Sequence, residues 1–115
     1  MITEHHMQAR FFAVIRRTHP NLLAFAIPNG FLRTKTMRIR AWREGVLSGV
    51  PDVFIPMPRG SHHGLFLEFK TTKGRVAPTQ QEFLNLVASR GYRAEVVYSL
   101  KQALEVLKDY MHEDP

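Results

Sequence analysis

The sequence contains no cysteine, so a disulfide scaffold and a metal site built on thiolates are both excluded. It also lacks any apolar run close to the roughly 20 residues that span a membrane. The start of the chain, Met1 to His6, has no apolar stretch of the kind found in signal peptides. These absences predict a soluble protein in a reducing compartment, the cytoplasm, with no membrane partner.

Acidic residues are in the minority. Ten Asp and Glu stand against sixteen Lys and Arg, which gives a formal net charge of +6 and an isoelectric point near 10.2. Such an excess suits a polyanionic partner, although it also suits a protein that is merely soluble. Internal repeats, linkers and Walker-type glycine loops are absent too. A length of 115 residues with 44% hydrophobic content predicts one folded domain over residues 1–115.

Two short apolar runs at the centre of the chain, within residues 49–56 and 65–70, are bounded by Gly or Pro and are typical of buried strands. Charged residues interrupt both runs: Asp52 opens the first, and Glu68 and Lys70 lie in the second. Because side chains alternate along a strand, Glu68 and Lys70 share one face, about 7 Å apart. If the strands pair, Asp52 reaches that face. Two carboxylates beside an ammonium make a site for a hard divalent cation.

The same residues have a plainer interpretation, which their pattern alone leaves open. Glu68 and Lys70 could form the exposed face of an edge strand, with Asp52 as a turn residue after proline. Two pairs of adjacent histidines, at 5–6 and 62–63, also invite a metal interpretation. Such pairs seldom bind metal without a third ligand, so we do not expect metal sites there.

A resemblance favours the catalytic interpretation. The order Gly-x-Pro-Asp and then Glu-x-Lys resembles the PD-(D/E)XK nuclease superfamily. Finer details resemble its VRR-NUC family, in the segments Ile27-Pro28-Asn29-Gly30, Gly49-Val50-Pro51-Asp52, Glu68-Phe69-Lys70 and Gly74-Arg75-Val76-Ala77-Pro78-Thr79-Gln80. The likeness runs from about residue 22 to residue 111, which is nearly the whole chain.

The resemblance implies an α/β fold with a restriction-endonuclease-like core, in which helices flank a mixed central sheet. The first three strands should run antiparallel, and a crossover helix should bring the last strand back in parallel. The implied activity is that of a Mg²⁺-dependent DNA endonuclease, with Mn²⁺ as a substitute ion. Asp52, Glu68 and the backbone carbonyl of Phe69 would hold the ion. Lys70 would orient the attacking water or stabilise the transition state.

Two further residues have roles that only the resemblance implies. A glutamine at the place of Gln80 faces the active site in the family and helps to hold it, although its neighbour Gln81 and a plain surface role remain open. Some members of the superfamily place a metal-binding glutamate on the first helix, where Glu4 is the only acid. Capping of that helix is the simpler role for Glu4.

Basic residues gather around the motif and are candidates for contacts with DNA phosphates. They are Arg33, Lys35, Arg38, Arg40 and Arg43 at an expected helix over residues 34–44, Arg59 in the loop between the central strands, and Lys73 and Arg75 after the second of them. The single tryptophan, Trp42, lies in the same helix, and we expect it to pack in the core rather than to stack on a base.

Periodicity and capping signals predict the remaining elements. Helices are expected at residues 3–18, with Met7, Phe11, Val14 and Ile15 as the buried stripe, at 78–90, and after the Ser99-Leu100-Lys101-Gln102 capping box. Phe83, Leu84, Val87 and Ala88 should form the buried stripe of the second of these. Strands are expected at residues 22–27 and 93–98.

The short chain leaves no room for a separate target-recognition domain, which favours selection by DNA structure over selection by sequence. The likeness to small phage-borne members suggests branched or Holliday-junction-like DNA as substrate, in a bacterium or a phage-infected host cell. Because a resolvase cuts two strands symmetrically, a homodimer is implied. Two alternatives stay open: a non-catalytic DNA-binding module or subunit that keeps the fold, and a structural protein whose acids form only a salt-bridge network.

Overall fold

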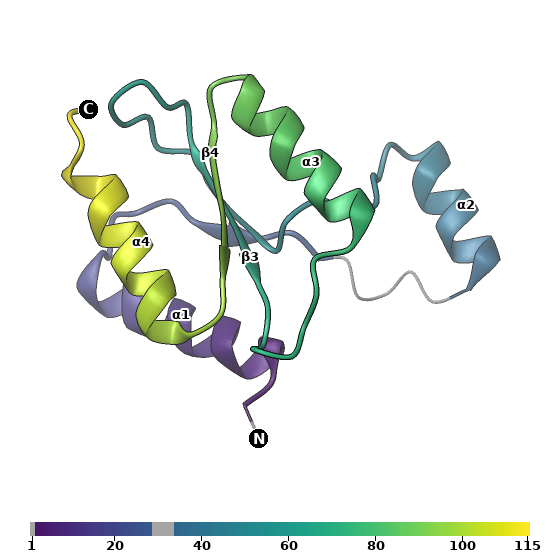
Figure 1. The fold of residues 1–115 in the computed structure, drawn as a ribbon, viewed down its shortest axis with the longest axis horizontal. Coiled ribbons are helices and arrows are strands. Elements are labelled where there is room, and N and C mark those ends of the chain that lie inside the picture. The colour runs from purple at the N-terminus through teal and green to yellow at the C-terminus, as the bar shows by residue number, and fades with distance from the viewer. Residues whose placement is uncertain (1, 29–33) are drawn as a thin grey trace.

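The computed structural model describes residues 2–28 and 34–115, and Figure 1 shows how they are arranged. Within these ranges the elements are α1 Glu4–Thr18, β1 Phe25–Ala26, α2 Lys35–Arg43, β2 Val53–Ile55, β3 Leu65–Phe69, α3 Pro78–Ser89, β4 Arg93–Val97 and α4 Leu100–His112. The strands form one sheet in the order β1-β2-β3-β4, in which β4 runs parallel to β3 and the other pairs are antiparallel. The predicted α/β fold with a mixed sheet is confirmed.

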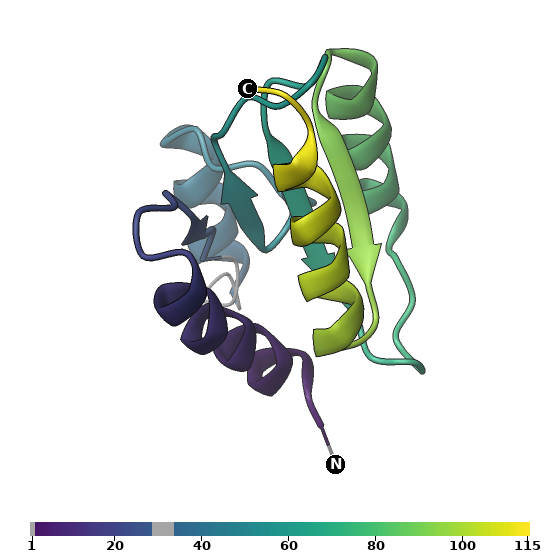
Figure 2. The same ribbon diagram turned by 90° about the vertical axis from the view of Figure 1, so that its left-hand side faces the viewer.

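The helices form layers on the two faces of the sheet. Helices α1 and α4 lie together on one face, and α3 lies on the other (Figures 1 and 2). Helix α3 connects β3 to its parallel neighbour β4, as a crossover must. Helix α2 stands apart at the right of Figure 1, beyond α3. No helix in the described ranges is long and apolar enough to cross a membrane.

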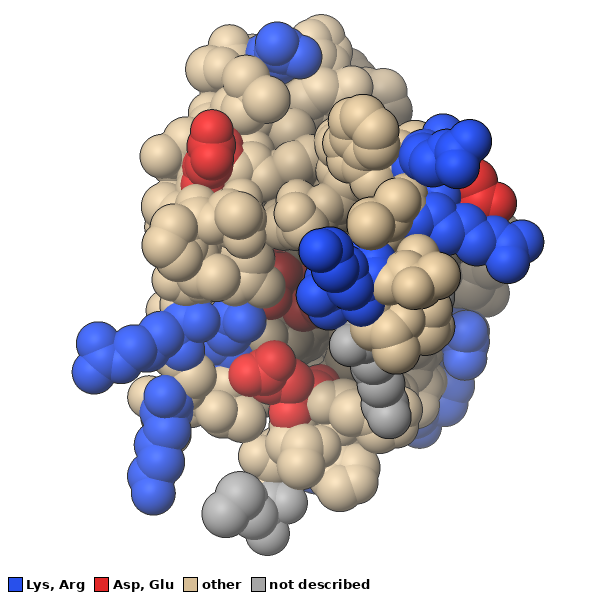
Figure 3. Space-filling model, turned by 90° about the vertical axis from the view of Figure 1, so that its right-hand side faces the viewer, with Lys and Arg blue, Asp and Glu red and all other residues tan. Residues whose placement is uncertain are grey.

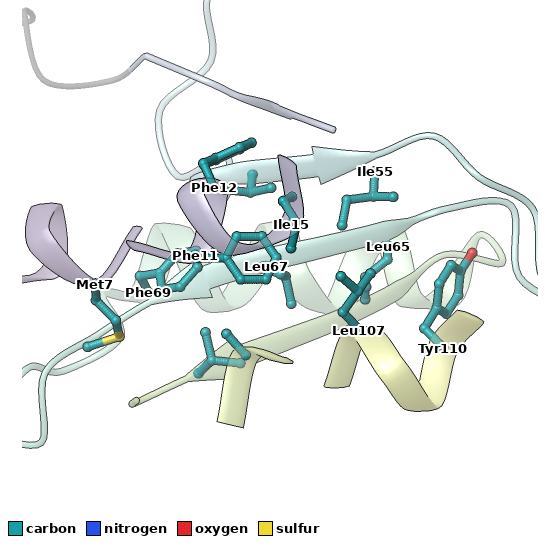
Figure 4. Packing of buried hydrophobic residues seen from close by; sticks show 13 residues of the cluster. Met7, Phe11, Phe12, Ile15, Ile55, Leu65, Leu67, Phe69, Leu107 and Tyr110 are labelled. Atoms are coloured by element: carbon teal, nitrogen blue, oxygen red, sulfur yellow. The ribbon is translucent and has the colours of Figure 1, made fainter. Parts of the chain in front are cut away.

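The main core lies between the sheet and the α1/α4 layer. Leu65, Leu67 and Phe69 of β3 are completely buried on this side, because alternate residues of a strand share a face. Figure 4 shows them packed with side chains of α1 and α4. Phe11 meets Phe69 edge to face, with ring centroids 5.6 Å apart. The hydroxyl of Tyr110 donates to the carbonyl oxygen of Met57 at 2.6 Å, which ties α4 to the loop after β2.

On the opposite face of the sheet, β3 carries an aromatic ring near its start and a charged side chain near its end. Phe66 stacks on Phe54 with centroids 4.4 Å apart and meets Phe83 of α3 edge to face at 5.8 Å. Glu68 is the next residue of β3 on this face, since it lies two positions after Phe66. This alternation places a carboxylate under α3 while the neighbouring residues of the strand fill the core.

The predicted starts of α1 and α4 are confirmed by their N-terminal caps. The side chains of Thr3 and Ser99 accept hydrogen bonds from the backbone N–H groups of His6 and Gln102, at 3.1 and 3.0 Å. Thr34 caps α2 in the same way, by accepting from the N–H of Met37 at 3.1 Å. These caps satisfy backbone donors that have no partner inside the helix.

The prediction that Trp42 packs in the core is wrong, because its side chain is 71% exposed. Only Ala41 of α2 is buried, so the helix touches the rest of the molecule along one narrow side. Successive residues of an α-helix are rotated by about 100° around its axis, so the side chain of Trp42 points away from the side on which Ala41 is buried. The sequence predicted this helix correctly. With only one buried residue in nine, however, its pattern does not indicate which side packs against the rest of the protein.

Smaller differences concern the length of one strand and the buried sides of two helices. The strand expected over residues 22–27 is regular only at Phe25–Ala26, because it pairs with the short β2 through Phe54 and Val53. In α1 the buried set includes Phe12, whereas Val14 is only partly buried. In α3 Ala88 is exposed, and only Leu84 is fully buried. The parts of the predictions that concern Asn29, Gly30 and Arg33 lie outside the described residues.

Candidate active site

The pairing of β2 with β3 brings Asp52 and Glu68 together. Val53 is the register partner of Leu67, so the residue before β2, Asp52, lies opposite Glu68. The Oδ2 atom of Asp52 accepts a hydrogen bond from the backbone N–H of Phe69 at 2.8 Å, which fixes its side chain at the end of β3. The two carboxylates therefore share one site although sixteen positions separate them in the chain (68 − 52 = 16).

Glu68 is the most deeply buried charged residue of the site, with only 2% of its surface exposed. Its Oε2 atom accepts from the side-chain N–H of Gln80 at 3.1 Å and lies 3.4 Å from Nζ of Lys70. Its Oε1 atom is buried and has no hydrogen-bond partner among the described residues. An unpartnered buried carboxylate oxygen is costly, and such groups in native proteins call for an ion, water or functional role.

Lys70 follows β3 directly and keeps its backbone in the sheet. Its N–H donates to the carbonyl oxygen of Val97 at 2.9 Å, which continues the parallel pairing with β4 by one residue. Its side chain is only 12% exposed, and its ammonium lies beside Glu68. The β3–β4 pairing thus holds an ammonium group at the edge of the carboxylate pair.

Gln80 lies in the first turn of α3, and both ends of its amide are occupied. Its Oε1 atom accepts from the N–H of Ala77 at 2.8 Å, while Nε2 donates to Glu68. Gln81 instead donates to Asn85 on the exposed side of α3, at 2.8 Å. Of the two glutamines that the sequence left open, Gln80 is the one that faces the carboxylates.

Burial changes the protonation of both acids. Desolvation raises the pKa of Asp52, although the hydrogen bond from Phe69 and the charge of Lys70 act in the opposite direction. Desolvation, followed by repulsion from Asp52, raises the pKa of Glu68 to about 7, with Lys70 again opposing the rise. A bound cation favours the ionised form of a carboxyl group. Two neighbouring acids with raised pKa values are therefore a suitable site for a cation.

The donor set fits Mg²⁺ better than Zn²⁺. No group of three His, Cys, Asp or Glu side chains gathers anywhere in the part of the chain that the structure describes. Mg²⁺ is usually held by one or two carboxylates and completes its shell with water or substrate phosphate. Zn²⁺ in proteins normally takes three or four nitrogen, sulfur or carboxylate ligands. Asp52 and Glu68, with the unpartnered Oε1, fit the first description.

Glu4 is close to the site without joining the pair. Its carboxylate lies beside Gly74, in the loop after Lys70, such that a Cβ on Gly74 would be 3.1 Å from it. Its negative charge also contributes to the raised pKa of Asp52. Glu4 begins α1, where its charge suits the helix dipole, as the capping interpretation expected.

Gly49 is a positioning residue that the sequence did not reveal. Its φ of +84° is in the left-handed region, and a Cβ here would lie 2.5 Å from the carbonyl oxygen of Thr79. The strand that carries Asp52 can therefore approach the first turn of α3 only because residue 49 has no side chain. The sequence showed a glycine before Pro51 and Asp52, but nothing in the sequence indicated that this glycine packs against Thr79.

The predicted DNA-contacting residues fall into two groups. Lys73 and Arg75 lie in the loop between Lys70 and α3, and the four cations of α2 are exposed beyond that helix's single buried residue. Figure 3 shows acidic side chains in a hollow at the centre of this face, with Lys and Arg on both sides. Arg59 lies instead at the opposite end of β2 and β3, in a loop whose Gly60 donates to the carbonyl oxygen of Asp114 at 2.6 Å.

The geometry agrees with comparisons to known proteins. The model of the VRR-NUC domain matches residues 27–101, which include every residue of the site just described except Glu4. The chain belongs to the VRR-NUC family. The VRR-NUC match covers β2, β3, α3 and β4 in full, so the family assignment and the site rest on the same elements.

Solved structures extend the VRR-NUC likeness beyond the matched segment. One "VRR_NUC domain protein" superposes with a TM-score of 0.88 at 25% identity, over 99% of this chain and 92% of that chain. A second, a "VRR_NUC domain", has a TM-score of 0.58 at 23% identity, over 90% and 97% of the two chains, and supports the fold alone. None of the curated proteins compared with the chain matches it. The VRR-NUC assignment makes this a nuclease-type fold.

Proposed function

We propose that the protein is a Mg²⁺-dependent DNA endonuclease that hydrolyses phosphodiester bonds, with Mn²⁺ as a substitute ion. The observation that carries the proposal is the carboxylate pair of half-buried Asp52 and buried Glu68, in which Oε1 of Glu68 has no hydrogen-bond partner among the described residues. The contacts of Glu68 with Lys70 and Gln80 both use Oε2, so a purely structural salt bridge would give no reason to place a second carboxylate, Asp52, beside it.

Each side chain of the site has a task that follows from its position. Asp52 and Glu68 would hold the ion, together with the backbone carbonyl of Phe69, and Gln80 would keep Glu68 in place. The bound ion would supply Lewis-acid chemistry, which neutralises charge on the scissile phosphate and makes water more acidic. Lys70 would orient the attacking water or stabilise the negative charge that develops on the phosphate.

The substrate in this proposal is branched DNA, such as a Holliday junction, selected by shape. Lys73 and Arg75 on one side and the cations of α2 on the other would contact phosphates without reading sequence. Cutting two strands of a junction symmetrically requires two sites, so we propose a homodimer. Light scattering should give about twice the chain mass of 13.3 kDa, and a monomer both with and without junction DNA would contradict the dimer.

The activity is tested by incubating the protein with four-way junction, splayed, single-stranded and linear duplex DNA, with Mg²⁺, Mn²⁺ or EDTA. We expect metal-dependent cutting of the junction by the wild type. Asp52→Ala should be inactive, whereas Glu105→Ala, which removes an exposed acid of α4, should cut normally. Equal cutting of every substrate would retain the nuclease and reject the junction preference. Binding without cutting under either metal would favour the non-catalytic DNA-binding module.

A further inference from the structure

Helix α2 carries the largest exposed aromatic side chain of the molecule next to a concentration of positive charge. Trp42 is 71% exposed, and Ile39 is 51% exposed. Nine residues are too few for a stable isolated helix in water, and most helical stability in proteins comes from packing. Since only Ala41 of α2 is buried, most of its surface is available to a partner.

The charge of α2 identifies the chemistry of that partner. Its sequence from Lys35 to Arg43 contains four cations and no acid, and Glu44 at its end pairs loosely with Arg40 at 3.9 Å. Two copies of the helix packed against each other would bring eight cations together (4 + 4). A nucleic acid instead neutralises these charges with its phosphates and offers flat apolar bases to an aromatic ring.

The arrangement along the helix places the aromatic ring among the charges. Lys35, Ile39 and Trp42 are spaced so that they lie along one side of α2, since residues three and four apart are neighbours on a helix. A ring on this side can meet a base while the ammonium of Lys35, two turns away on the same side, meets a phosphate farther along the strand. This combination of cation and aromatic ring is how proteins bind unpaired nucleotides.

Helix α2 is also within reach of the carboxylate pair. Gly49 lies six residues after Arg43, and its backbone packs against Thr79 and Gln80, next to Glu68. Six extended residues span at most about 20 Å, which is about six steps of 3.4 Å along a DNA strand. A strand with a phosphate at the site therefore needs only about six further nucleotides to reach α2.

We propose that Trp42 stacks on an exposed base face near the scissile phosphate, and that α2 in this way selects DNA that has open base faces. This inference deepens the proposed function, because it takes DNA as the ligand of the same site. In a closed duplex each base face is covered by its neighbours, so an indole ring finds no platform. At a branch point or in a single strand, a base face is open to the indole ring.

Trp42 is the only tryptophan of the chain, so its fluorescence reports directly on this contact. The experiment titrates the wild type in EDTA with a four-way junction, a single strand and a relaxed, covalently closed circular duplex, which has neither ends nor hairpin loops. We expect strong quenching by the first two and little by the closed duplex. Equal quenching by all three would overturn the inference. So would a blue shift that grows with protein concentration without DNA, because it would place a second copy on Trp42.

Affinities for labelled DNA provide the second measurement. Trp42→Ala should weaken binding to junction and single strand by roughly 5- to 150-fold, the range expected for the loss of one stacked base, and should leave the closed duplex almost unaffected. Trp42→Phe should retain most of the affinity. Leu47→Ala removes a side chain of similar exposure (55%) just after α2 and should change nothing. Junction affinity of Trp42→Ala equal to that of the wild type would overturn the inference.

Two checks separate this inference from the proposed nuclease. Trp42→Ala should melt within about 2 °C of the wild type, because substitution of an exposed residue changes stability little. The titrations in EDTA require neither metal nor cutting. Selective quenching without metal-dependent cutting would reject the nuclease and keep the role of Trp42. Cutting of junctions without selective quenching would do the reverse.

Discussion

The two faces of strand β3 have the same backbone and opposite tasks. On the face toward α1 and α4, Leu65, Leu67 and Phe69 are completely buried in an apolar core. On the face toward α3, Phe66 is followed by Glu68 and then by Lys70 just beyond the strand. Five residues of one strand thus supply both the centre of the core and the acid at the centre of the site.

The difference shows how a small chain can hold a charged group rigidly. Glu68 is buried as deeply as many core residues, and the strand that carries it is held in place by the packing of its other face. Its raised pKa is the cost of that burial. A carboxylate on a surface loop would avoid the cost but would not be positioned so closely against Asp52 and Lys70.

The separate roles of the two faces are tested most directly by truncating two neighbouring residues of β3. Glu68→Ala should lower the cutting rate by at least about 1,000-fold while the protein stays folded. Leu67→Ala should lower the free energy of unfolding by about 2–5 kcal/mol, yet its folded fraction should still cut DNA. Circular dichroism and a cutting assay below the melting temperature measure both. Loss of folding in Glu68→Ala would show that the two faces are not separable.

A smaller effect on the cutting rate is expected at Gly49, where the backbone leading to Asp52 packs closely against the first turn of α3. Gly49→Ala places a Cβ 2.5 Å from the carbonyl oxygen of Thr79, at a φ of +84° that alanine adopts with strain. The segment that leads to Asp52 must then move away from α3. A shift of about 1 Å in a catalytic group can reduce turnover by about 100-fold. Gly45→Ala is the matched control, because φ is also positive there but a Cβ meets nothing within 4 Å.

Cutting by the Gly45 variant should remain near the wild-type level, with only a modest loss of stability from the backbone strain. If both glycine variants lost activity equally, backbone strain rather than contact with Thr79 would be responsible. Single-turnover rates at saturating Mg²⁺ separate the two explanations.

The amide of Gln80 should contribute about 10-fold to the cutting rate, because it orients a metal-ligand candidate rather than touching substrate. Gln80→Ala removes both of its hydrogen bonds, whereas Gln81→Ala removes only an exposed bond to Asn85. We expect the Mg²⁺ concentration for half-maximal cutting to rise in the first variant and to stay constant in the second. Equal behaviour of the two would remove Gln80 from the site.

The smallest expected effect is on the pH dependence of stability. Because the pKa of Glu68 is raised to about 7 from 4.5, the folded state binds more protons than the unfolded state between these values. The free energy of unfolding without metal should therefore fall as pH rises through this window, by linkage. Melting in EDTA at pH 5 and pH 8 should show the fall, and Glu68→Gln should reduce it. Mg²⁺ should raise the melting temperature more at pH 8 than at pH 5.

Much of the fold was predictable because its signals are local. The alternation in residues 65–70 and the caps Thr3 and Ser99 rest on neighbouring residues, and each agrees with the structure. The grouping of Asp52 with Glu68 needed the pairing of two strands, which alternation suggested and the family resemblance supported.

The features that could not be predicted all depend on contacts between distant segments. Nothing near Trp42 in the sequence shows that α2 packs only through Ala41, so a large aromatic side chain was assigned to the core. The contact of Gly49 with Thr79 joins residues thirty positions apart (79 − 49 = 30), and no local pattern marks it. The choice between Gln80 and Gln81 depended on the rotation of α3 above the sheet.

The hydrogen bond from Gln80 to Glu68 has a consequence for protein synthesis. Gln80 lies in the crossover between β3 and β4, so it leaves the ribosome after both carboxylates and Lys70. Strand β4, which anchors the backbone of Lys70, follows later still. A nascent chain therefore contains the charged residues of the candidate site before it contains the parts that hold them in place. Completion of the site is therefore delayed until β4 has been made.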